Sequence, residues 1–160
     1  MKHLALLGVL LSFAVAPARA EPTIFIVRHA EKAAVAPDNK DPDLSEAGRA
    51  RAEALARILR DVKIETIYVT EFKRTQETAA PLARLMSLNP ITIQSADRAA
   101  LIEKLKGASG DVLVVGHGNT IGEIIKKLGI DTPIEIAEND YDNLFVITLG
   151  EKPRLLRLHF

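Results

Sequence analysis

The chain alternates short apolar runs with longer stretches in which apolar residues recur at helical spacing. The runs predict strands at 23–28, 65–70, 91–94 and 111–116, and the stretches predict helices at about 45–61, 73–87, 97–107 and 119–129. This rhythm is typical of an α/β fold, a three-layer α/β/α sandwich around a mostly parallel central sheet. Two further runs, 143–149 and 154–160, predict a hairpin added to that sheet.

Local signals refine these elements. Ser45 is a good N-cap for the first helix, and Glu46 suits its positive end. Pro81 falls inside the second helix and should kink it or mark its real start. The long segment Glu31–Asp43 is rich in Pro, Asp, Asn and Lys. Long loops inside compact domains are often functional, so we expect this one to form a wall of a site.

The first twenty residues have the features of a secretory signal. Lys2 precedes an apolar core at 4–16, and Ala18-Arg19-Ala20 matches the small-x-small cleavage pattern. The apolar run is shorter than the roughly 20 residues that span a bilayer. We therefore expect a signal peptide at 1–20, one domain at 21–160, a periplasmic or secreted location and no stable membrane insertion after cleavage. An uncleaved membrane anchor is the alternative.

Charge and cysteine content exclude several classes of function. Cleavage removes Lys2 and Arg19 and no acidic residue, which leaves 19 basic and 21 acidic side chains. This balance gives no electrostatic footprint for nucleic acid. The absence of cysteine excludes disulfides, thiol catalysis and thiolate metal sites. Any attraction for anions must therefore come from a local cluster.

Such a cluster is predicted where the strands end. Arg28 and His29 follow the first strand, His117 follows the strand at 111–116, and Arg74 lies in the first turn of the helix after 65–70. These positions meet at one edge of an α/β sheet, where such folds bind ligands. A neutral imidazole can attack phosphorus, guanidinium groups match phosphoryl oxygens, and a helix N-terminus favours anions. The combination indicates phosphate chemistry.

Two rival interpretations use the same residues. The segment Gly116–Gly122 imitates a dinucleotide-binding turn, but it comes late in the chain and lacks a suitable acidic residue after it. A metal site built from His29, Glu31 and His117 would have suitable ligands, but the neighbouring arginines would repel a cation. Each residue alone also has an ordinary structural interpretation, such as a solvated strand end or an exposed helical arginine.

The ordered motifs resemble those of a known family. Arg28-His29-Ala30-Glu31, Leu44-Ser45-x-x-Gly48, the segment Thr70–Ala79 with Arg74-Thr75-x-x-Thr78, and Gly116-His117-Gly118 are similar to the motif series of the histidine phosphatase superfamily, also called phosphoglycerate mutase-like. The resemblance runs over essentially the whole mature chain. It implies a phosphoglycerate mutase-like sandwich, a phosphohistidine intermediate, a small phosphorylated substrate, and no metal or other cofactor. By motif, His29 is the nucleophile, and Arg28, Arg74 and His117 form the phosphate pocket.

The proton donor is less well defined by the motifs. The acid phosphatase branch of the family has an Asp where this chain has Gly118, and neither Asp97 nor Glu103 aligns with the Glu of the mutase-like branch. Glu31 is the best candidate for the general acid, because leaving-group protonation needs a carboxylic acid within hydrogen-bond reach. The alternative is that Glu31 only orients an arginine.

The sequence therefore predicts a phosphatase that hydrolyses phosphate monoesters through a phosphohistidine on His29. Two alternatives stay open: a non-catalytic phosphate-binding domain of the same fold, and a phosphohistidine protein phosphatase. The physiological substrate and the oligomeric state are not encoded in any pattern that we recognise.

Overall fold

The computed structural model describes residues 21–34 and 38–160, so the predicted signal peptide at 1–20 lies outside the described residues. The elements in chain order are β1 (Thr23–Arg28), α1 (Glu46–Leu59), β2 (Ile64–Val69), α2 (Lys73–Met86), β3 (Ile91–Thr92), α3 (Arg98–Lys106), β4 (Asp111–Gly116), α4 (Gly118–Lys127), β5 (Asn143–Thr148) and β6 (Arg154–His159). Each predicted helix and strand is present, although β3 is shorter than expected. Within the described residues, no helix has the length and apolar content needed to cross a membrane.

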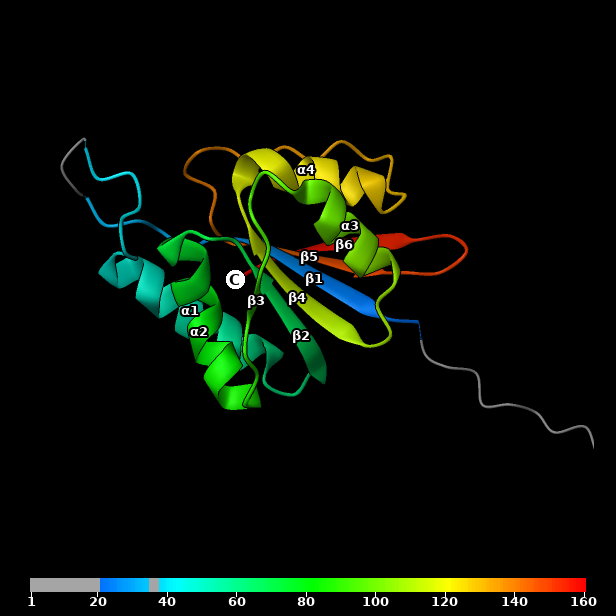
Figure 1. Ribbon diagram of the computed structural model, residues 1–160, viewed down its shortest axis with the longest axis horizontal. Helices are drawn as coiled ribbons and strands as arrows, with labels where there is room; N and C mark the ends of the chain where they lie inside the picture. The colour runs from blue at the N-terminus through cyan, green and yellow to red at the C-terminus, as the bar shows by residue number, and fades with distance from the viewer. Residues whose placement is uncertain (1–20, 35–37) are drawn as a thin grey trace, which may run out of the picture.

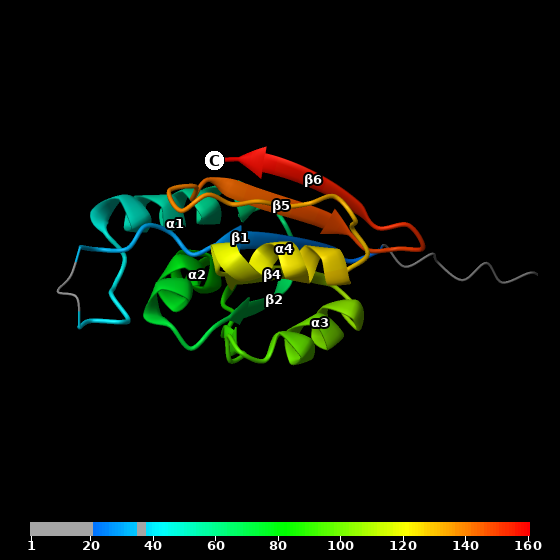
Figure 2. The same ribbon diagram turned by 90° about the horizontal axis from the view of Figure 1, so that it is seen from above.

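The strands form one mixed sheet in the order β3-β2-β4-β1-β5-β6. The four strands β3, β2, β4 and β1 are parallel, whereas β5 runs antiparallel to β1 and pairs with β6 as the predicted hairpin. Figures 1 and 2 show α1 and α2 on one face of the sheet and α3 and α4 on the other. The predicted three-layer α/β/α sandwich is confirmed.

The two faces of the sheet are built by the alternation of side chains along each strand. In β1, Phe25 and Val27 pack against α1 and α2, while Ile24 and Ile26 pack against α3 and α4. All four side chains are buried. A strand covered on both faces must be apolar at consecutive positions, which explains the uninterrupted apolar run in the sequence.

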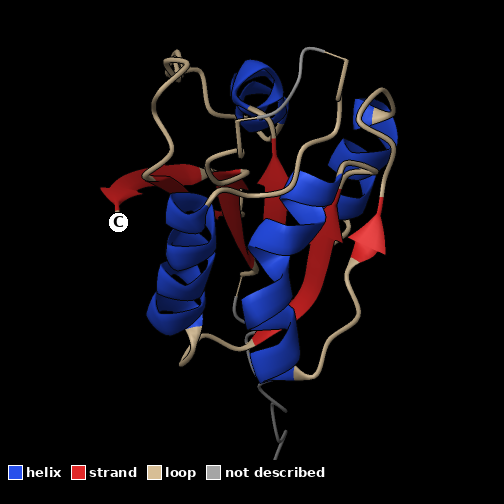
Figure 3. Cartoon of the chain, turned by 90° about the vertical axis from the view of Figure 1, so that its left-hand side faces the viewer, coloured by secondary structure: helices blue, strands red, loops and turns tan. Residues whose placement is uncertain are grey.

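The first two helices lie side by side against one face, as Figure 3 shows. Ser45 caps α1 as predicted, because its hydroxyl accepts a 3.0 Å hydrogen bond from the Gly48 amide. Gly48 is required by close packing, since a Cβ there would lie 2.2 Å from the Glu31 carbonyl oxygen. Helix α2 runs from Lys73 through Pro81 without a break, so the proline does not mark the start of the helix.

The central strands β2, β4 and β1 are neighbours, and their carboxyl ends lie at one edge of the sheet. The chain leaving β1 continues to α1 on one face, and the chain leaving β4 continues to α4 on the opposite face. The divergence of these two connections opens a crevice between the ends of β1 and β4. The candidate residues of the sequence analysis lie around this crevice.

Candidate active site

The two histidines predicted from sequence come together at the crevice. The amide of His29 donates a 2.9 Å hydrogen bond to the Gly116 carbonyl, which ties the end of β1 to the end of β4. The imidazole rings of His29 and His117 have centroids 5.4 Å apart in an edge-on arrangement. Only 5% of His29 and 9% of His117 is exposed. Neither residue is therefore a solvated strand end.

The backbone fixes the tautomer of His29. Its Nδ1 lies 2.8 Å from the Ala30 carbonyl oxygen, and because a carbonyl only accepts, Nδ1 must carry the proton. Ala30 is held in turn by its amide, which donates to the hydroxyl of Thr78 over 2.9 Å. Nε2 consequently has the free lone pair, and it forms no hydrogen bond within the described residues. His29 is arranged as a nucleophile.

Arg28 is anchored by neutral groups. Its Nη1 donates to the main-chain carbonyls of Ala137, Glu138 and Asp140 at 2.9, 2.7 and 3.3 Å. Its guanidinium carbon lies 4.1 Å from the centre of the Tyr141 ring, a stacked cation–π arrangement. Its Nε is buried and has no hydrogen-bond partner among the described residues. Since a buried N–H without a partner is costly, this edge of Arg28 is suited to an anion.

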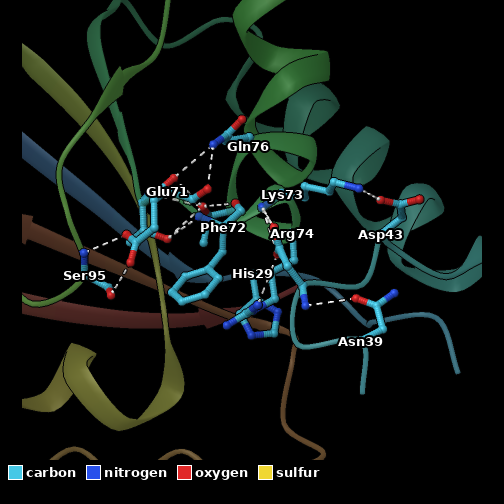
Figure 4. A network of polar contacts seen from close by, with 12 residues as sticks. His29, Asn39, Asp43, Glu71, Phe72, Lys73, Arg74, Gln76 and Ser95 are labelled. Carbon is cyan, nitrogen blue, oxygen red and sulfur yellow. Dashed lines mark hydrogen bonds and ion pairs between the residues drawn. The ribbon is translucent and has the colours of Figure 1, made fainter. Parts of the chain in front are cut away.

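Arg74 repeats this arrangement from the other side. It is the second residue of α2, and its guanidinium carbon lies 4.2 Å from the centre of the Phe72 ring. Its Nη1 makes a 3.5 Å ion pair with Asp41, and its buried Nε has no partner within the part of the chain that the structure describes. Figure 4 shows Arg74 beside His29, whereas the adjacent Lys73 reaches away toward Asp43. The two arginines therefore present unpaired N–H groups to the same crevice.

The environment keeps both histidines neutral. Burial lowers the pKa of His29 to about 4, and the positive charges of Arg74 and Arg28 act in the same direction. Burial also lowers the pKa of His117 to about 4, with a further contribution from Arg74. At neutral pH both rings therefore have a free lone pair, and the positive charge of the site belongs to the arginines.

The crevice opens as a cleft of about 360 Å³. Its walls are formed by residues from β1, α2, α4 and the segment before β5: Arg28, His29, Lys32, Arg74, His117, Gly118, Asn119, Ile136 and Glu138. The predicted nucleophile His29 and the three residues predicted to form the phosphate pocket all line this one cleft. A phosphoryl group in it would meet two guanidinium groups and two imidazoles.

The structure corrects the expected role of Glu31. Its carboxylate forms a bidentate ion pair with Arg51, with Nε and Nη2 of the arginine at 2.9 and 2.7 Å from Oε1. Partial burial alone would raise the pKa of Glu31, but the hydrogen bonds from Arg51 outweigh it and hold the pKa below its usual range. An ionised carboxylate tied to an arginine outside the cleft cannot donate a proton there. The contacts match the alternative, in which Glu31 orients an arginine.

Glu71 is the other carboxylate close to the histidines. Its oxygens accept hydrogen bonds from the amide and the hydroxyl of Ser95, both at 2.7 Å, and Figure 4 shows the pair. Burial raises the pKa of Glu71, but these hydrogen bonds outweigh it, and the net pKa lies below the usual range. Glu71 therefore ties the segment before α3 to the β2–α2 turn as an ionised group.

The long segment Glu31–Asp43 contributes to the site through its two described ends. Lys32 lines the cleft, and its backbone bridges to Leu44. Asp41 pairs with Arg74 and accepts a 3.1 Å hydrogen bond from the Lys73 amide at the start of α2. The segment therefore borders the site, as expected. Residues 35–37 lie outside the described residues.

Metal ligation has little support in the geometry. Within residues 21–34 and 38–160, no group of three or more His, Cys, Asp or Glu side chains could hold a metal ion. The rival set of His29, Glu31 and His117 is separated, because Glu31 turns to Arg51 while the imidazoles face the cleft.

Sequence reasoning missed several residues of the site. Phe72 and Tyr141 stack on the two arginines, and Thr70 contacts Nε2 of His117 over 3.0 Å. Thr70 and Phe72 precede Arg74 by four and two residues in the sequence. Their closeness to a predicted site residue could have indicated that they belong to the site. Tyr141 is separated from α4 by a long irregular segment that contains no motif. Tyr141 reaches the cleft only because the chain returns there to pair β5 with β1.

Comparisons with known proteins find a match to a phosphatase family over part of the chain. The model of the histidine phosphatase superfamily (branch 1) matches residues 24–98. A Schizosaccharomyces pombe protein described as a "probable phosphatase" is 31% identical over 113 residues, 66% of this chain and 54% of the relative. The chain thus spans about half the length of that curated relative.

Solved structures share the fold. The protein histidine phosphatase SixA complexed with tungstate superposes with a TM-score of 0.71 at 20% identity, over 86% of this chain and 96% of SixA. A mycobacterial glucosyl-3-phosphoglycerate phosphatase superposes with a TM-score of 0.65 at 16% identity, over 86% and 97% of the two chains. At these identities the likeness concerns the fold alone. Over residues 24–98 the sequence is similar to the histidine phosphatase superfamily, and the fold is similar to that of these solved structures.

Proposed function

We propose that this chain is a phosphatase that hydrolyses phosphate monoesters through a phosphohistidine on His29. One observation carries the proposal: the free Nε2 of His29 faces a cleft in which two buried arginine Nε groups have no partner among the described residues. A phosphoryl group would satisfy both arginines, and its phosphorus would then lie within reach of the imidazole.

The reaction divides into two transfers. The Nε2 lone pair of His29 forms a bond to phosphorus while the bond to the leaving oxygen breaks, and water later displaces the phosphoryl group from the histidine. Arg28 and Arg74 neutralise the charge that builds on the phosphoryl oxygens. Because the aromatic rings and carbonyls already hold both guanidinium groups, little reorganisation is needed during the reaction.

The test combines turnover with detection of the intermediate. We expect the wild-type protein to hydrolyse an aryl phosphate and, on rapid acid-free quenching, to carry one acid-labile phosphoryl group. His29→Ala should lose both properties. The matched control is His159→Ala, because His159 lies on the exposed strand β6. Phosphate binding without turnover in the wild-type protein would instead support the non-catalytic phosphate-binding domain.

A second candidate is hydrolysis of phosphorus–nitrogen bonds, as in phosphohistidine. The observation that favours it is the state of the carboxylates: Glu31 and Glu71 are both held ionised by their partners. A leaving nitrogen takes up a proton more readily than a leaving alkoxide oxygen does. Its departure therefore depends less on a carboxylic acid. The likeness to SixA, whose name describes a protein histidine phosphatase, points the same way. Comparing a phosphorylated histidine peptide with an alkyl phosphate separates the two candidates.

We also propose that the protein is exported. Support comes from the signal-like pattern of residues 1–20, which ends in Ala18-Arg19-Ala20. Fractionation of the producing cell, followed by N-terminal sequencing, is the test. A protein that begins at Glu21 outside the cytoplasm is expected, and an intact Met1 in the cytoplasmic fraction would contradict the proposal.

A further inference from the structure

The second histidine is held by a chain of two hydroxyl groups. Nε2 of His117 lies 3.0 Å from the Thr70 hydroxyl, which lies 3.0 Å from the hydroxyl of Thr75. Thr75 is fully buried in the first turn of α2. Each buried hydroxyl has one proton, which it donates to one partner. The tautomer of His117 can therefore be inferred from the distances between these groups.

The proton of Thr75 can be placed first. Its Oγ1 lies 2.8 Å from the Phe72 carbonyl oxygen, the shortest of its contacts, and a carbonyl only accepts. The same Oγ1 accepts the Thr70 amide over 3.1 Å. With its one proton donated to Phe72, Thr75 can only accept from the Thr70 hydroxyl, because two lone pairs facing each other at this distance would repel.

The protons of Thr70 and His117 can then be placed. The Thr70 hydroxyl gives its one proton to Thr75 and is left as an acceptor toward His117. Nε2 of His117 must then carry a proton. In the neutral ring the lone pair is on Nδ1, which has no hydrogen bond in the described part of the chain and is not among the buried polar atoms without a partner. Nδ1 therefore keeps some exposed surface, and it belongs to a ring that lines the cleft.

We propose that Thr75, acting through Thr70, is a positioning residue that holds His117 as the Nε2–H tautomer and thereby makes Nδ1 the proton carrier of the site. This role rests on the proposed phosphatase function. It also fills the position of general acid that Glu31 leaves open, because Nδ1 belongs to a ring that lines the same cleft as His29.

The proton and electron balance is complete with a phosphate monoester monoanion. The substrate transfers its proton to Nδ1 of His117 on binding. Nε2 of His29 then bonds to phosphorus, the phosphorus–oxygen bond breaks, and the leaving oxygen takes the electron pair together with the proton from Nδ1. In the second transfer, the neutral Nδ1 accepts a proton from the attacking water while the nitrogen–phosphorus bond breaks and its electron pair returns to His29. Nδ1 then gives this proton to the product, which leaves as dihydrogen phosphate, and His117 is neutral again for the next substrate.

The two histidines thus carry opposite tautomers. His29 is protonated on Nδ1 by its contact with the Ala30 carbonyl, and His117 is protonated on Nε2 by the hydroxyl chain. Each ring turns a different nitrogen to the cleft, one as the nucleophile and one as the acid and base. This opposition is a direct and measurable consequence of the proposal.

The primary test is nitrogen-15 NMR of the imidazole rings in the substrate-free wild-type protein at neutral pH. We expect His117 to show the chemical shifts of the Nε2–H tautomer and His29 those of the Nδ1–H tautomer. An Nδ1–H tautomer at His117 would overturn the inference. This readout needs no turnover, so the proposed phosphatase function can fail without affecting it.

Variants then test the role of the hydroxyl chain. Thr75→Val removes the hydroxyl with little change of shape, which frees the Thr70 proton to go to Nε2 of His117 and should populate the Nδ1–H tautomer. Thr75→Ser keeps the hydroxyl and should keep the wild-type tautomer. Thr66→Val, in β2 four residues before Thr70, is the control for stability. An unchanged tautomer in folded Thr75→Val would contradict the proposal.

Kinetics provides the final discrimination. Thr75→Val should lose about tenfold more kcat/KM for an alkyl phosphate than for an aryl phosphate, because only the poor leaving group needs the proton. Thr75→Ser should restore the wild-type ratio. Equal losses for both substrates in Thr75→Val would show a merely structural role. If Thr75→Val fails to fold, the wild-type spectrum and Thr75→Ser still decide the assignment.

Discussion

Each half of the proposed phosphate pocket consists of one histidine and one arginine, but the two halves hold these side chains through different contacts. On the β1 side, His29 and Arg28 are fixed by main-chain carbonyls. On the β4 side, His117 is fixed by a hydroxyl chain and Arg74 by the carboxylate of Asp41. Each arginine stacks on one aromatic ring, Tyr141 or Phe72. The proposed nucleophile His29 is therefore held by main-chain carbonyls, which every sequence possesses, whereas His117 depends on particular side chains that substitution can change.

The largest expected effect separates the two histidines. His29→Ala should lower kcat/KM for an aryl phosphate by at least ~10³-fold, because the covalent route disappears and only binding and electrostatics remain. His117→Ala should lower it by ~10²-fold and still form the phosphohistidine slowly. Steady-state kinetics and quenched labelling measure the two effects. Equal losses with no labelling in either variant would show that the two halves act as one unit.

The next largest expected effect is a difference in kcat/KM between variants of the two arginines. Arg28→Lys should lower kcat/KM by about 10²-fold and Arg74→Lys by about tenfold, because a lysine cannot reproduce the forked contacts of either residue. Only Arg28 also holds the carbonyls of residues 137–140, so its variant should lose about 1 kcal/mol of unfolding free energy as well. Denaturant unfolding of both variants checks this. A larger loss of stability in Arg74→Lys would invert the comparison.

The stability of the pocket should depend on pH. Both buried histidines have a pKa near 4, below the value of 6.5 expected when unfolded. The stabilisation from keeping them neutral is therefore fully present above pH 6.5 and is lost as the pH falls toward 4. The loss is on the order of 3 kcal/mol per histidine, reduced where the two rings interact.

The measurement is unfolding free energy between pH 7 and pH 4 for the wild-type protein and for His29→Asn and His117→Asn. Each variant should show a flatter profile than the wild type. His159→Asn, at an exposed position of β6 where the imidazole contacts Asp142 over 3.0 Å, is the control and should keep most of the wild-type slope. A variant profile as steep as that of the wild type would place the sensitivity to acid elsewhere.

The smallest expected effect concerns Glu31, which lies outside both halves. Glu31→Gln should change kcat/KM for an alkyl phosphate by less than about threefold, because its carboxylate is bound to Arg51 and does not donate a proton. Loss of the partly buried ion pair should lower the unfolding free energy by about 1 kcal/mol. A loss of activity confined to poor leaving groups would restore Glu31 as the general acid.

Prediction from sequence succeeded where a signal is local. Uninterrupted apolar runs gave the strands, Ser45 and Glu46 gave the start of α1, and the ends of the strands gave the positions of Arg28, His29, Arg74 and His117 around the cleft. It left Glu31 open between a general acid and a partner of an arginine, because no local pattern fixes the direction of that side chain. Successive side chains leave the backbone in different directions, and Glu31 turns to Arg51 on α1 instead.

The sequence by itself determined the helices and strands and the candidate residues at the strand ends, His29 among them, since these depend on periodicity and on which residues follow an apolar strand. Only the tertiary structure decided the protonation of the site. Which nitrogen of His29 or His117 is free depends on the acceptor that lies opposite it: the carbonyl of Ala30 in one case and the hydroxyl of Thr70, just after β2, in the other. Hydrogen-bond partners that are distant in sequence are set by packing, and no local pattern encodes them.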